Sequence, residues 1–339
     1  LVDEACRRDR LSLVGVEVAL HRQKVFVTGC ITTNPPLNKA EILSIVQETF
    51  FEAGYGQQWS PHPHELQVEM DVRLERLDDD HRHLRTIADD QAICVGYAGG
   101  RKADRYLPAA HRLAYLAGQK MQQERAKYDL GPDGKVIVTC HHDEVERISL
   151  SLHHKTAYDS RDLFRLAREI ACWIGLDDLD GISVNGGGDF DVGGPWGDNG
   201  LSGKKLVMDA YGPTVPIGGG AWSGKDPHKI DRSGGLIARY LALRAVRMGL
   251  GAEALVQLGW HPGDEQPSVR TLRLDGAERS WDLLGIQEIS LAAIWKRLQL
   301  GTVRFASYAD GSWFQKSAPW DVRPVAIEKS SLQPVGSVM

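Results

Sequence analysis

Hydrophobic and polar residues alternate along much of the chain, and elsewhere the hydrophobic residues recur at helical spacing. The alternation predicts strands, which cover residues 11–20, 24–33, 66–75, 135–140, 146–152, 205–211, 254–260 and 268–274. The helical spacing predicts helices, which cover residues 39–53, 109–127, 161–174, 235–248 and 281–298. We expect Asn38 and Ser160 to cap two of these helices at their start, and Gly54 and Gly175 to follow their ends.

The order of these elements predicts the fold class. In three places a pair of strands precedes a helix, which indicates an α+β protein of three similar β-β-α subdomains. Each subdomain would be a sheet with helices on one face. The expected N-terminal, central and C-terminal subdomains are residues 1–80, 86–192 and 193–325.

Residues 75–85 read ERLDDDHRHLR and have no hydrophobic face. Such a charged stretch is typical of a solvated, mobile loop. It is interpreted either as a plain connector or as a lid over a site.

Composition excludes several classes of protein. The 339 residues are 42% hydrophobic and 25% charged, as in globular proteins, which excludes a disordered chain. No stretch reaches the ~18 uncharged apolar residues of a membrane-spanning helix. The net charge of −5 lacks the basic footprint of a nucleic-acid binder. We therefore expect neither a membrane nor a nucleic acid as partner.

The five cysteines are widely spaced and form no CxxC pair. This pattern argues against a disulfide framework or a cysteine-based zinc site, and it favours a reducing cytoplasm. The chain shows no recognisable signal peptide, and it begins at Leu1 rather than at Met.

Chemistry-bearing residues concentrate in a glycine-rich segment, residues 186–224, which holds 13 of the 36 glycines. Glycines let a backbone approach a ligand closely and present N–H groups to an anion. Lysines that neutralise phosphate and aspartates that bind Mg²⁺ lie within and just after this segment. This combination indicates a site for a nucleoside triphosphate. The alternative, a flexible linker, is disfavoured by Trp196, Tyr211 and Trp222.

A P-loop is a poor explanation of the same segment. Gly219, Gly224 and Lys225 have its spacing, but Asp226 stands where Ser or Thr would bind Mg²⁺, and no strand leads into Gly219.

Three segments resemble signatures of the S-adenosylmethionine synthetase family: GGPWGDNGLSGKK (193–205), DAYG (209–212) and GGGAWSGKDPHKIDRS (218–233). The family patterns are GGPxGDxGLTGRK, DTYG and GGGAFSGKDxxKVDRS. Weaker likenesses include GCITT (29–33) to the family's GEITT, and ADDQAICVGYA (88–98) to AGDQGLMFGYA. The resemblance spans nearly the whole chain in order.

This resemblance implies three similar subdomains around a pseudo-threefold axis. It also implies a homodimer, or a tetramer, with the active site at the subunit interface. The implied reaction joins ATP and L-methionine: the sulfur attacks C5′ of the ribose, triphosphate leaves, and the same site hydrolyses it to phosphate and diphosphate. A pair of Mg²⁺ ions and K⁺ are the implied cofactors.

The resemblance also implies roles for individual residues. The ATP site would be lined by Asp133, Lys135, Phe190, Asp198, Lys204, Lys205, Ala221, Lys225 and Lys229, with Phe190 stacking near adenine. The methionine site would include Cys30, Asp90, Gln91, Asp198 and Lys229. The residues expected to take part in catalysis are Lys135, Asp198, Lys205, Lys225 and Lys229. Asp231 would bind Mg²⁺, and Glu17 would bind K⁺.

The chain departs from the family pattern at several of these positions. Cys30 replaces a glutamate that contacts the methionine amino group, and a thiol cannot supply its charge. Lys204 and Asp189 replace arginines, and Ile217 replaces a histidine. The family's HPDK segment, which contacts triphosphate and Mg²⁺, is expected upstream of Leu1.

These departures leave three hypotheses. The chain is a divergent S-adenosylmethionine synthetase, an adenosyltransferase of the same fold for a methionine analogue, or a catalytically weak regulatory paralogue.

Overall fold

The computed structural model describes residues 1–156 and 158–321, and its strands form three sheets. The first sheet has the order β3-β2-β1-β8, with bounds β1 Leu13–His21, β2 Lys24–Thr33, β3 Gln67–Arg76 and β8 Gly200–Leu201. β1 and β2 form an antiparallel hairpin, and β3 runs parallel to β2. Helix α2 (Lys39–Glu52) shares a buried core with this sheet, and α1 (Val2–Arg8) contacts β2.

The second sheet joins strands from distant parts of the chain in the order β11-β10-β9-β4. Their bounds are β4 Ala92–Ala98, β9 Ala254–Trp260, β10 Val269–Leu274 and β11 Ala277–Arg279. Helix α6 (Ile230–Arg247) packs on β4 and β9, and α7 (Leu291–Arg297) packs on α6. This close packing requires Gly96, because a Cβ there would lie 2.0 Å from the carbonyl of Ala238.

The third sheet has the order β5-β6-β7, with bounds β5 Gly134–His141, β6 Glu144–Leu152 and β7 Ile182–Val184. Helices α3 (Ala109–Glu124) and α4 (Ser160–Trp173) cover one face and enclose a separate hydrophobic core with it. The outward-facing side chains of β5 alternate with the buried ones, so Lys135 and Ile137 point away from this core.

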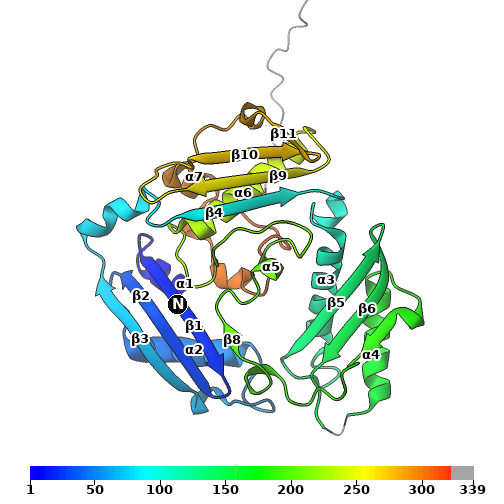
Figure 1. The fold of residues 1–339 in the computed structure, drawn as a ribbon. Helices are drawn as coiled ribbons and strands as arrows, with labels where there is room; N and C mark the ends of the chain where they lie inside the picture. The colour runs from blue at the N-terminus through cyan, green and yellow to red at the C-terminus, as the bar shows by residue number, and fades with distance from the viewer. Residues whose placement is uncertain (157, 322–339) are drawn as a thin grey trace, which may run out of the picture.

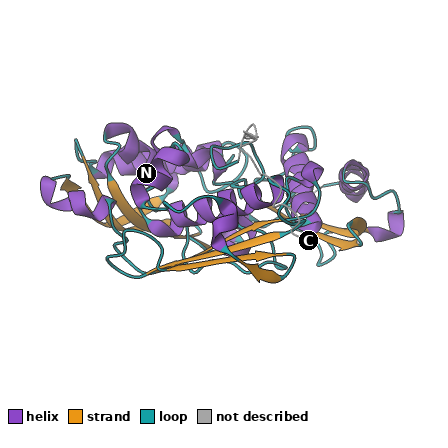
Figure 2. Ribbon diagram, turned by 90° about the horizontal axis from the view of Figure 1, so that it is seen from above, coloured by secondary structure: helices purple, strands orange, loops and turns teal. Residues whose placement is uncertain are grey.

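The three sheets surround a central region that contains the short helix α5 (Leu206–Asp209) (Figure 1). Figure 2 shows most helices toward one side of the molecule and most strands toward the other. The α+β class is thus confirmed, and the approximate threefold relation stays a prediction. Within the described ranges, no helix has the length and hydrophobicity needed to span a membrane.

The sheets do not follow the predicted subdomain limits. β4 falls within the predicted central subdomain, 86–192, but pairs with β9 of the second sheet. β8 falls within 193–325 but pairs with β1 of the first sheet. The limits fail because strands far apart in sequence pair with one another, so sheet membership does not follow the order of the chain. Residues 322–325 of the predicted C-terminal subdomain lie outside the described residues.

Three predicted elements are wrong. Residues 205–211 are predicted as a strand because Leu206, Met208 and Ala210 alternate with the period of a strand. In the structure, residues 206–209 form α5. The predicted helix 281–298 is two elements separated at Gly285, which has φ +62°. Residues 79–85 of the charged stretch, expected as a loop, form a 3-10 helix, and Arg85 Nε at its end donates to Leu11 O.

Of the two predicted helix caps, one is confirmed and the other is wrong. Asn38 caps α2 in a reciprocal capping box with Glu41, as predicted. Ser160 is wrong by one position, because Asp159 is the cap that accepts from Arg161 N. Gly54 and Gly175 follow the ends of α2 and α4 with positive φ, as predicted.

Candidate functional site

One strand edge organises the site. The free edge of β1 binds residues 224–226 near its start: Val16 N donates to Gly224 O (3.0 Å), and Asp226 N donates to Val14 O (3.0 Å). The buried Asp226 carboxylate also accepts from Val14 N at 2.6 Å. Gly224 has φ +82°, and a Cβ there would lie 2.0 Å from Val16 O. Glycine is therefore required for this close approach.

The other half of the same edge binds an earlier part of the glycine-rich segment. Val18 N donates to Ser202 Oγ at 2.8 Å, and Ser202 N donates to Val18 O at 2.9 Å. β8 pairs with β1 next to these bonds, and Arg22 N donates to Pro195 O. A single strand therefore holds both ends of a segment rich in glycine, lysine and aspartate.

Residues 220–226 form what we call the lysine turn, which carries Lys225. The Lys225 ammonium lies 2.6 Å from the Asp231 carboxylate, and these side chains are 23% and 19% exposed. Asp231 lies in the first turn of α6, where backbone N–H groups are unpaired and the helix dipole is positive. A Cβ at Gly220 would lie 2.0 Å from this carboxylate, so the turn passes directly beside it.

Lys229, the residue before α6, forms an ion pair that the sequence analysis missed. Its ammonium donates to Asp89. Burial lowers the pKa of Lys229, but the hydrogen bond and charge of Asp89 outweigh it and leave the pKa raised. The predicted Asp90 carboxylate accepts instead from Gln91 N, at 2.8 Å. The sequence signal for Asp89 was that it replaces the glycine of the family's AGDQG.

Asp198 and Lys204 form a second lysine–aspartate pair, in the more open part of the segment. Their charged atoms are 3.1 Å apart, and Lys204 also donates to Asn199. The hydrogen bond from Lys204 is the main cause that lowers the pKa of Asp198, and the charge of Lys135 contributes. Lys205 is exposed and precedes α5. The structure thus brings two of the predicted cations, Lys204 and Lys135, near the Asp198 carboxylate, and Lys205 follows Lys204 in sequence.

Asp133 and Phe190 belong to a third group, beside the third sheet. Asp133 accepts from Gly194 N at 2.8 Å, which connects it to the glycine-rich segment. The Phe190 ring lies 5.3 Å from the ring of His153, which lies 4.5 Å from that of Trp59. A small pocket lined by Asp133 and His153 adjoins this group. Trp59 was missed, since nothing in its local sequence indicates this contact.

The remaining predicted residues lie on the helix-free face of the first sheet. Cys30 and Lys225 both pair with Gly15, one on each side, so all three form a row across the sheet. Side chains of paired residues share a face, which places Cys30 and Lys225 roughly 10 Å apart at their backbones. Gly15 between them has no neighbour where a side chain would be. Glu17 lies on the same face, opposite Thr28.

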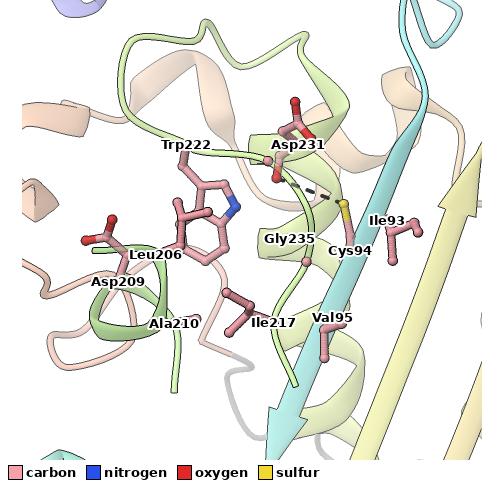
Figure 3. Close-up of a pocket in the computed structure, with 12 residues that line it drawn as sticks. Ile93, Cys94, Val95, Leu206, Asp209, Ala210, Ile217, Trp222, Asp231 and Gly235 are labelled. Atoms are coloured by element: carbon pink, nitrogen blue, oxygen red, sulfur yellow. Dashed lines mark hydrogen bonds between the residues drawn. The ribbon is translucent and has the colours of Figure 1, made fainter. Parts of the chain in front are cut away.

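A central pocket connects these elements (Figure 3). It lies between β4, α5 and the start of α6, and its lining includes Ile93, Asp209, Trp222 and Asp231. Burial raises the pKa of Asp209 to about 6. Ala221, expected in the ATP site, adjoins this pocket. It packs on Gly203, since a Cβ built at Gly203 would lie 2.8 Å from the Cβ of Ala221.

The carboxylates of the described residues suit a cation shared with phosphate. No group of three or more His, Cys, Asp or Glu side chains able to hold a metal occurs in the part of the chain that the structure describes. Mg²⁺ commonly takes one or two protein carboxylates together with substrate phosphates. Asp231, with Lys225 beside it, fits that arrangement.

Comparison with known proteins gives consistent results. Residues 192–322 match the family model of the S-adenosylmethionine synthetase C-terminal domain. The chain is 32% identical over 292 residues to the S-adenosylmethionine synthase of Zymomonas mobilis, covering 79% of this chain and 73% of that one. It is 31% identical over 283 residues to that of Petrotoga mobilis, covering 74% and 69%. An unusual S-adenosylmethionine synthetase from Campylobacter jejuni has a similar structure, with TM-score 0.82, 26% identity and coverage of 95% and 90%.

Proposed function

This chain belongs to the S-adenosylmethionine synthetase family, and we propose that it transfers the adenosyl group of ATP to the sulfur of L-methionine at the site around the lysine turn. One observation supports this most: Lys225 and Asp231 meet at the start of α6, next to a strand edge that also binds residues 200–202, which lie between Asp198 and Lys204 in sequence. This arrangement places cations and carboxylates around a position suited to a polyphosphate.

The chemistry explains why cations dominate the site. A thioether sulfur is already nucleophilic, so the reaction needs no general base to activate it. The barrier lies in the departing triphosphate, whose negative charge grows as the C5′–O bond breaks. Lys225 would stabilise that charge from the enclosed side, and Lys135, Lys204 and Lys205 from the open side. The same cations would hold the triphosphate during its hydrolysis to phosphate and diphosphate.

The implied metal ions fit these residues to different degrees. Asp231 would hold Mg²⁺ together with the phosphates, where the ion supplies further neutralisation of charge. Glu17 would take part in binding K⁺ on the helix-free face. Lys229 and Asp90 would lie near the amino acid, and Phe190 near the adenine.

We also propose a homodimer whose interface covers the helix-free face. Cys30 and Glu17 lie on this face of the first sheet, so a second copy of the chain would enclose the row from Cys30 to Lys225. The second and third sheets also expose apolar side chains, including Ile93 (63% exposed) and Ile137 (67% exposed). All five cysteines are free, consistent with the proposed cytoplasmic location.

The test is mass spectrometry of the products formed from ATP, Mg²⁺, K⁺ and a panel of thioethers, with the full chain as enzyme. We expect an adenosylated sulfonium product and the release of phosphate and diphosphate. Absence of product with every thioether would refute the proposal. If ATP still bound under those conditions, the regulatory alternative would be favoured.

A second candidate function is adenosyl transfer to a thioether altered at its amino end. Cys30 stands where the resembling family has the glutamate that contacts the methionine ammonium, and its Sγ lies 3.5 Å from Thr32 Oγ1. No charge at position 30 would therefore bind an ammonium group. A lost charge-assisted hydrogen bond corresponds to roughly 10- to 150-fold in affinity.

A competition between L-methionine and its des-amino analogue distinguishes the two candidates. We expect Cys30→Glu to shift the ratio of specificity constants toward L-methionine. Thr28→Glu is the matched control, because it adds the same charge to the same face two pairs along the ladder. An unchanged ratio in Cys30→Glu would show that position 30 does not contact the amino group.

A further inference from the structure

Arg232 is a buried cation directly behind the lysine turn. It is 2% exposed, and its guanidinium donates from Nε (2.9 Å) and Nη2 to Trp222 O. Burial lowers its pKa to about 10, so it remains charged at neutral pH. The guanidinium lies 4.3 Å from the centre of the Phe305 ring and 5.3 Å from that of Trp313. Burying a charge is unfavourable unless strong contacts compensate, and the hydrogen bonds from Nε and Nη2 both go to one carbonyl.

That carbonyl belongs to the residue that begins the bend carrying Lys225. Trp222 O also accepts from Lys225 N, at 3.4 Å. The Trp222 indole is also held by packing. It contacts the rings of Trp313 and Phe314 edge to face, with ring centroids 5.4 and 5.3 Å away. It also fills the space over Gly235, where a Cβ would lie 2.7 Å from the indole (Figure 3).

We propose that Arg232 is a positioning residue for the reaction, acting on Lys225 through the carbonyl of Trp222. This rests on the proposed function. Arg232 fixes where the bend begins, and the hydrogen bonds of Gly224 and Asp226 with β1 fix where it ends. Lys225, between these points, is held at the distance that its contact with Asp231 requires. The aromatic residues 305–314 contribute by supporting the guanidinium.

Arg239 provides a matched control on the same helix. It is also fully buried, and burial also lowers its pKa to about 10. Its guanidinium likewise donates to backbone carbonyls, those of Tyr97, Arg105 and Tyr106, and lies near aromatic rings. These carbonyls lie at the end of β4 and after it, not in the lysine turn.

The experiment compares Arg232→Lys with Arg239→Lys in the full chain. Both substitutions are expected to lower the melting temperature. Arg232→Lys should lower kcat at least ~10-fold with little change in the KM for methionine, whereas Arg239→Lys should retain kcat. Equal losses of kcat in the two variants would overturn the proposal, because they would indicate a structural effect alone.

A second measurement does not depend on catalysis. Brief acetylation, followed by mass spectrometry, reports the accessibility of Lys225 relative to Lys204. We expect Lys225 to react several-fold faster in Arg232→Lys than in Arg239→Lys or the parent. Phe305→Leu, which keeps the arginine but weakens its support, should shift Lys225 in the same direction if Arg232→Lys does not fold. Unchanged labelling of Lys225 in the folded variants would refute the positioning role even if the proposed activity were absent.

Discussion

Two lysine–aspartate pairs in this molecule have the same separation in sequence and very different surroundings. Lys225 and Asp231 are six residues apart, as are Asp198 and Lys204. In the first pair both side chains are mostly buried, whereas the aspartate of the second is 67% exposed. The first is fixed by a strand edge, a helix start and Arg232, and the second by local bonds to Asn199. Identical chemistry is thus placed once in an enclosed and once in an open setting.

This difference in exposure determines how much each ion pair contributes to electrostatic stabilisation. An exposed ion pair is screened by water and salt and is worth about 0–1 kcal/mol. Charges in a partly enclosed site interact more strongly, because the effective dielectric constant is lower. We therefore expect the enclosed pair to dominate stabilisation of the triphosphate.

The largest expected effect follows from removing the enclosed cation. Lys225→Ala should lower kcat at least ~100-fold, the scale of losing a preorganised electrostatic contact. The chain should still fold, and Lys296→Ala on the exposed side of α7 serves as control. Steady-state kinetics measures the loss. Turnover close to that of the parent would remove Lys225 from its assigned role.

The role of the enclosed Asp231 carboxylate should be visible in the Mg²⁺ dependence of the activity. Asp231→Asn keeps the shape of the side chain and removes its charge, so we expect the Mg²⁺ concentration for half-maximal activity to rise ~10-fold or more. Raised Mg²⁺ should restore part of the activity. Asp198→Asn tests the open pair in the same titration. Coincident Mg²⁺ curves for Asp231→Asn and the parent would exclude Asp231 as a ligand.

The open pair should tolerate substitution better. Lys204→Ala removes a contact worth at most ~1 kcal/mol, which corresponds to a loss of about 5-fold or less in kcat/KM. Added salt should reduce the difference between variant and parent further. A loss as large as that of Lys225→Ala would show that substrate binding encloses both pairs equally.

Asp209 gives the smallest effect and extends the comparison to stability. It follows the open segment in sequence but lines the same pocket as Asp231, and burial raises its pKa to about 6. The folded state thus binds more protons than the unfolded state between about pH 4 and 6, so this group's contribution to stability falls as pH rises through that range. Asp209→Asn should gain melting temperature relative to the parent from pH 5 to pH 7.5. A constant difference across this range would place the carboxylate in water.

Local signals predicted the elements that depend on local chemistry. The capping box at Asn38 was predictable because both partners lie within four residues. The start of α6 was predicted too late, at 235, because Gly234 and Gly235 are poor helix formers. They are needed there for packing, since a Cβ at Gly234 would lie 2.7 Å from Cys94 Sγ. That requirement comes from another part of the chain.

The candidate site shows the same limit. Residue types and motifs indicated Lys225, Asp231, Asp198 and Lys204, and the structure pairs them. Asp90 was predicted to lie at the methionine site and Asp89 was not, yet it is Asp89 that pairs with Lys229, because one position along a turn changes the direction of a side chain. The row from Cys30 through Gly15 to Lys225 joins three segments by non-local pairing, which no local pattern encodes.

The pairing at the edge of β1 has a consequence for folding during synthesis on the ribosome. Val14 and Asp226 are 212 residues apart, and their bond closes an edge that is otherwise an open template for another strand. We therefore expect part of the edge of the nascent β1–β2 hairpin to stay unpaired until residue 226 has been synthesised. Such long-range closure slows folding and exposes intermediates to aggregation. We expect the yield of refolding to fall steeply with protein concentration, and chains cut short before residue 226 to depend on chaperones.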